Sequence, residues 1–100
     1  MMITGSQCHA ARALAEVSRD ELALSSGIGA EIIADFEQRI AEPDRDIITN
    51  LQSALERAGA VFIHENGGGI GVRLKFTKSD TRRLSVLESE GGIAADDDVP

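Results

Sequence analysis

The sequence predicts a mainly α-helical domain of four helices, followed by a β-hairpin and an acidic tail. Helix-capping patterns occur at Thr4 with Gln7 and at Ser18 with Glu21, and apolar residues recur at helical spacing as far as Gly59. Beyond that glycine the pattern changes to alternation around a glycine run, which is typical of two strands joined by a turn. We therefore expect a helical domain over residues 1–59, a hairpin extension over 60–76 that can serve for dimerisation, and a weakly helical to disordered acidic tail over 77–100.

The first predicted helix starts after Thr4 and runs to about Glu16. It is expected to support the helices that follow, through an apolar stripe formed by Cys8, Ala11, Leu14 and Ala15. Because Cys8 is the only cysteine, no intrachain disulfide framework is expected. No basic cluster lies near it in sequence, so we interpret Cys8 as a small buried hydrophobic residue and not as a reactive thiol.

The next two predicted helices are short and are separated by a glycine turn. The first begins after the cap at Ser18 and ends at Gly27, which can adopt the left-handed conformation that terminates helices. The second starts at about Ala30 and continues to Arg39. Its expected apolar face is Ile32, Ile33 and Phe36, and its expected solvent or partner face is Glu31, Asp35 and Glu37. Two helices joined in this way form a helix-turn-helix, whose second helix can enter a DNA major groove.

The fourth predicted helix follows a loop at Pro43 and is the most strongly periodic segment of the chain. Its apolar face consists of Ile47, Ile48, Leu51, Ala54, Leu55 and Ala58. Gly59 is expected to end the helix, and this segment is interpreted as core. The first turn, with Arg45 and free backbone N–H groups, is a possible phosphate contact.

Residues 60–65 and 71–76 are the predicted strands, and Asn66 to Gly69 form the turn between them. The triple glycine lacks both a Gly-Lys-Ser/Thr ending and a following helix, so a hairpin turn is preferred to a phosphate cradle. Because a lone hairpin is marginally stable, we expect it to pack on the helices or to pair with a second subunit.

Composition restricts the possible functions. The chain has 100 residues, 42% of them apolar, and a net charge of −7. Two histidines and one cysteine are too few for a zinc site, the acidic run 96–98 is interpreted as solvated tail, and no cofactor is expected. No nucleophile with a paired histidine and no phosphate loop is visible, so an enzyme is not expected. Without a long apolar run or a signal peptide, we expect a cytoplasmic protein that does not associate with membranes.

Residues 3 to about 75 resemble the Xre-type, lambda-repressor-like helix-turn-helix regulators, especially a small bacterial branch with a glycine-rich hairpin. The matching stretches are 3–5, 10–14, Ser18, 21–23, Gly27, 33–37, Pro43, Leu51, 54–56, 58–59, 62–63, 65–69 and 71–74. The resemblance implies a compact domain that binds double-stranded DNA, commonly as a homodimer, in transcriptional control.

The resemblance also implies contact positions. Arg19 stands where the family usually has a glutamine, and Gly29, Ala30 and Glu31 stand where it has a serine or threonine followed by polar residues. Asp35 faces the groove in the family pattern and recurs in this branch. The DNA-binding residues carried over are Arg19, Ala30, Glu31, Asp35, Gln38, Arg39 and Arg45.

The alternative is an acidic helix-turn-helix module that binds a protein, in the manner of an antiactivator or antitoxin. Residues 18–39 contain two arginines and five acidic residues, and such a charge opposes contact with phosphates. The hairpin or the tail around Leu84 and Leu87 would then be the contact surface.

Overall fold

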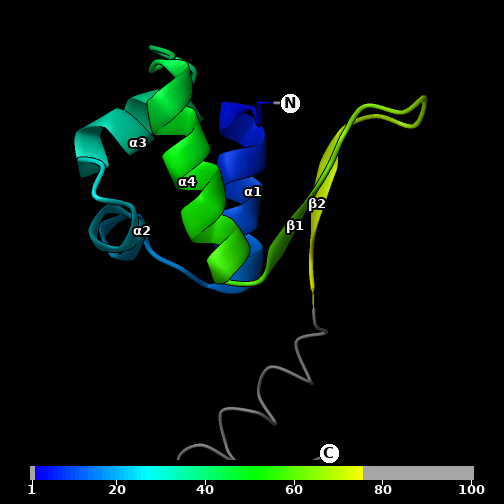
Figure 1. The fold of residues 1–100 in the computed structure, drawn as a ribbon. Helices are drawn as coiled ribbons and strands as arrows, with labels where there is room; N and C mark the ends of the chain where they lie inside the picture. Colours follow the sequence, from blue (N-terminus) through cyan, green and yellow to red (C-terminus); the bar gives the residue numbers. More distant parts are fainter. Residues whose placement is uncertain (1, 76–100) are drawn as a thin grey trace, which may run out of the picture.

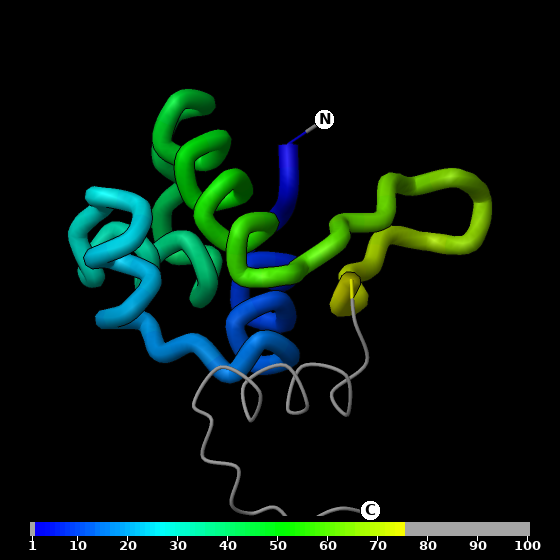
Figure 2. Tube along the Cα trace, turned by 60° about the horizontal axis from the view of Figure 1, so that its bottom comes forward, coloured from blue at the N-terminus to red at the C-terminus, as the bar shows by residue number. Residues whose placement is uncertain are grey.

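A computed structural model of the chain describes residues 2–75, which form a mainly helical body with a two-stranded antiparallel hairpin. In Figures 1 and 2, α4 runs through the middle, with α2 and α3 on one side and the hairpin on the other. The predicted order of elements is therefore confirmed as far as residue 75, and the tail 77–100 lies outside the described residues. The elements are α1 (Gly5–Ala15), α2 (Arg19–Ser26), α3 (Ala30–Glu37), α4 (Arg45–Arg57), β1 (Ala60–Ile63) and β2 (Gly71–Leu74).

Local signals set the helix ends. Both predicted capping boxes are present, with Thr4 and Gln7 closing the start of α1 and Ser18 and Glu21 closing the start of α2. Gly27 ends α2 with φ 76°, as predicted. None of the helices within residues 2–75 combines the length and apolarity needed to cross a membrane.

The core lies where α1, α2, α3 and α4 meet. Its largest fully buried side chains come from every helix, and each one contributes roughly 1.5–3 kcal/mol by leaving water, or less for the smaller cysteine. They are Leu22, Ile33, Ile48, Leu51, Leu55 and Cys8. The prediction that Cys8 is buried is confirmed.

Three predicted core positions are wrong. Leu14 is 43% exposed and Ile32 is 40% exposed. Ala58, expected on the apolar face of α4, is also exposed, because it is the cap that follows the last residue of the helix. At about 100° per residue, Leu14 falls beside the buried positions of α1, which centre on Cys8 and Ala11. Ile32 is similarly turned away from Ile33, its buried neighbour in α3.

The hairpin is joined to the helical body through Gln7. Its strands pair from Ala60 opposite Leu74 to Ile63 opposite Gly71. The Gln7 side-chain Nε2 donates to the backbone oxygens of Gly71 at 2.9 Å and Ile63 at 3.4 Å. The expectation that the hairpin packs on the helices is therefore confirmed, and the capping residue of α1 also connects α1 to both strands.

Candidate functional site

The candidate site is the outer side of the α2 and α3 pair, which lies at one edge of the molecule (Figure 1). The turn between the helices contains Gly27, Ile28 and Gly29. On α3, Glu31 is exposed, Ala30 and Asp35 are half-buried, and Gln38 is exposed at the helix C-terminus. These four predicted contact residues thus come from one helix and its cap.

Glu37 was expected to face solvent or a partner, and this expectation is wrong. Its side chain is only 1% exposed. It accepts two hydrogen bonds of 2.7 Å from Arg12, one from Nε and one from Nη2. The reason is helical geometry, because Glu37 lies one turn after the buried Ile33 and shares its inward face.

Arg19 is a second cation beside the same carboxylate. Its Nη2 lies 3.3 Å from Oε1 of Glu37, and its side chain is 36% exposed. Its Nε is buried without a hydrogen-bond partner. We call Arg12, Arg19 and Glu37 the ion group. Because the bidentate contact with Arg12 already neutralises Glu37, the ion group carries one surplus positive charge at the start of α2.

The surroundings of the ion group also shift the pKa values of Glu37 and of the neighbouring Cys8. Burial raises the pKa of Glu37, but hydrogen bonds from Arg12, Cys8 and Arg19 and the charge of Arg12 outweigh it and leave this pKa below its ordinary value. Burial, followed by the charge of Glu37, raises the pKa of the Cys8 thiol, whose Sγ donates to Oε2 at 3.3 Å. Cys8 is therefore a protonated donor inside the protein, which fits the prediction that it is not a reactive thiol.

The other predicted cations are separate from this group. Arg39 follows the end of α3 in a left-handed conformation, with φ 60°, and its Nη1 donates to Oγ of Ser6 in α1 at 3.4 Å. Arg45 is exposed at the first position of α4. The structure therefore brings Arg19 to the ion group, and it directs Arg39 toward the start of α1.

Sequence reasoning missed the pairing of Arg12 with Glu37. A possible signal was an arginine in the middle of an alanine-rich helix, where a charge needs a partner on another element. Within residues 2–75, both ion pairs within 4 Å involve Glu37, so Glu31 and Asp35 remain uncompensated. In the same part of the chain, no group of three potential ligands could hold a metal ion.

No protein-family model matches this chain, and no curated protein is significantly similar to it in sequence.

Proposed function

We propose that this chain is a non-enzymatic, DNA-binding transcriptional regulator that acts as a homodimer. In this proposal α2 and α3 form a helix-turn-helix, and α3 enters the major groove with Ala30, Glu31, Asp35 and Gln38 facing the bases. The observation that carries the proposal is the surplus guanidinium of Arg19. It lies half-exposed at the start of α2, while Arg12 neutralises the carboxylate of Glu37.

The charges of the site support a particular mode of binding. Arg19 at the start of α2 and Arg45 at the start of α4 lie at the positive ends of helix dipoles, where phosphate is favoured. Glu31 and Asp35 oppose nonspecific attraction to phosphates. Each carboxylate can accept a hydrogen bond from a cytosine amino group, and a good base contact discriminates by about 1–3 kcal/mol. We therefore expect weak, salt-sensitive binding with a contribution from base reading.

A titration against salt tests the proposal. Fluorescence anisotropy would follow the full chain binding to labelled duplexes from the promoter of its own operon and to random duplex. Arg19→Gln is expected to lower the slope of log K against log salt by about 0.9 per arginine removed. Arg57→Gln is the matched control, because the Arg57 guanidinium donates to the backbone oxygen of Ser25, away from the ion group. If the wild type binds neither duplex at low salt, the proposal fails.

A second candidate function is binding of a basic protein partner, and two exposed apolar residues favour it. Leu24 of α2 is 86% exposed, and Ile32 of α3 is 40% exposed beside the uncompensated Glu31 and Asp35. Acidic groups around apolar side chains suit a basic, amphipathic surface. Capture of one specific protein that survives Arg19→Gln but is lost with Ile32→Ser would favour this function over DNA binding.

A further inference from the structure

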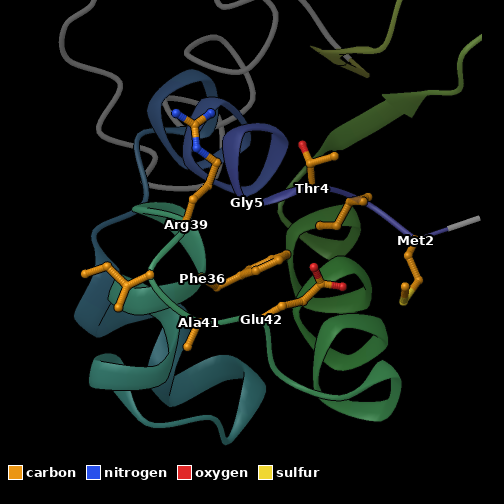
Figure 3. Close-up of a pocket in the computed structure, with 9 residues that line it drawn as sticks. Met2, Thr4, Gly5, Phe36, Arg39, Ala41 and Glu42 are labelled. Atoms are coloured by element: carbon orange, nitrogen blue, oxygen red, sulfur yellow. The ribbon is translucent and has the colours of Figure 1, made fainter.

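A hollow of about 490 Å³, which we call the N-terminal hollow, lies between the start of α1 and the segment that follows α3. Figure 3 shows Arg39 and Met2 on opposite sides of this hollow, with Phe36 and Glu42 between them. Phe36 is buried, whereas Met2 is 40% and Ile40 is 67% exposed. The hollow therefore presents an apolar surface to solvent between a positive and a negative side chain.

Within the described part of the chain, neither Arg39 nor Glu42 forms an ion pair with a residue of opposite charge. Arg39 and Glu42 both line the hollow, but they form no ion pair with each other or with another residue in 2–75. The side-chain contact of Arg39 is a 3.4 Å hydrogen bond to Ser6. A partner that covers the hollow must therefore bring an apolar group, an anion for Arg39 and a cation for Glu42.

A second copy of the chain meets all of these requirements. In a two-fold contact the same patch faces itself, so Arg39 of each copy can meet Glu42 of the other while Ile40 and Met2 lie between them. The chain has a net charge of −7, and two copies should repel over most of their surfaces. The hollow carries one charge of each sign and is a place where they can meet without that repulsion.

We propose that the N-terminal hollow is a two-fold contact between two copies of this chain, held by Ile40 and by reciprocal Arg39–Glu42 pairs. The contact has fewer than half of the 20–30 or so residues per side of a standard interface, so the dimer should be weak. The inference rests on the proposed function and assigns a contact surface to its homodimer. Arg19 and Arg45 lie outside this surface and remain the phosphate contacts. The inference is tested without DNA, so its failure would remove this dimer contact but leave the proposal that the chain binds DNA standing.

Sedimentation equilibrium of the full chain over a wide concentration range gives the first test. The wild type should associate to a dimer, and Ile40→Glu should weaken this association at least about tenfold. Leu24→Glu is the control, because Leu24 is 86% exposed on α2 and outside the hollow. A wild type that remains monomeric would overturn the inference, as would equal effects of the two variants.

Charge reversal gives the second test. Arg39→Glu and Glu42→Arg should each weaken the dimer, because each places like charges together across the two-fold axis. The double variant should restore association toward the wild-type value. If the double variant associates no better than the single variants, the reciprocal pairing is wrong. A monomeric wild type that binds an apolar dye, with binding lost in Ile40→Glu, would instead assign the hollow to a small apolar ligand.

Discussion

Replacing Glu37 with glutamine is expected to lower the free energy of unfolding by about 3–5 kcal/mol. Glutamine keeps the volume of the side chain but removes its charge. Arg12 then remains charged with its side chain only 12% exposed, and it loses a partner that holds it through two hydrogen bonds of 2.7 Å. A buried charge left without its counterion is among the largest single losses that a small domain can suffer.

The expected loss is large relative to the stability of such a domain, which is about 5–15 kcal/mol. At roughly 4–8 °C per kcal/mol for a domain of this size, the melting temperature should fall by about 12–40 °C. Urea titration followed by circular dichroism measures the change. Glu31→Gln is the matched control on the same helix, because Glu31 is exposed and forms no ion pair with another residue in 2–75, and it should change stability by less than about 0.5 kcal/mol.

A pH series and a double-mutant cycle test the cause. Because the folded protein lowers the pKa of Glu37, its charge stabilises the fold above the ordinary value of 4.5, and this contribution is lost as pH falls through the folded pKa. The difference between wild type and Glu37→Gln should therefore shrink in acid. Arg12→Met with Glu37→Met should be less destabilising than the two single changes added together. A loss similar to that of Glu31→Gln, or additive single effects, would refute the reasoning.

Four further substitutions test individual contacts and backbone conformations. Gly5→Ala should destabilise by more than about 2 kcal/mol in urea titration, because the new Cβ would overlap the backbone oxygen of Phe36. At Gly29 a Cβ has open space, so Gly29→Ser should change stability by a few tenths of a kcal/mol. Gln7→Glu keeps an acceptor for the α1 cap but removes the donor to the hairpin carbonyls, so hydrogen exchange should accelerate in both strands before it does in the helices. Arg39→Gly should stabilise the monomer by roughly 0.5–1 kcal/mol, since φ 60° is strained for arginine and free for glycine; an unchanged urea midpoint would contradict this.

Most of the fold could be predicted because its signals are local. The capping boxes at Thr4 and Ser18 each depend on a residue three positions later, and Gly27 and Gly59 end their helices by their own backbone conformations. The change from helical to alternating pattern marks the hairpin in the same way. Such features are set within one turn or one strand, so no knowledge of distant residues is needed.

The outer residues of the candidate site were also predictable, but their environment was not. Sequence spacing places Glu31 and Asp35 on one face of α3, one turn apart. The same spacing places Glu37 one turn after the buried Ile33, but it does not show that Arg12, 25 positions away in sequence, pairs with the carboxylate there. The same holds for Arg19, whose surplus charge exists only because Arg12 occupies both carboxylate oxygens.

The sequence by itself determined the order of the helices and strands, the caps that begin α1 and α2, the apolar face of α4, and that Cys8 is buried. Tertiary structure alone decided which charges cancel, that Gln7 connects α1 to the hairpin, and that Gly5 must lack a side chain beside Phe36. The physical reason is the separation in sequence between the residues that interact. Capping and periodicity act between near neighbours in the chain, whereas the pairing of buried charges and the close approach of two backbones depend on how separate elements pack.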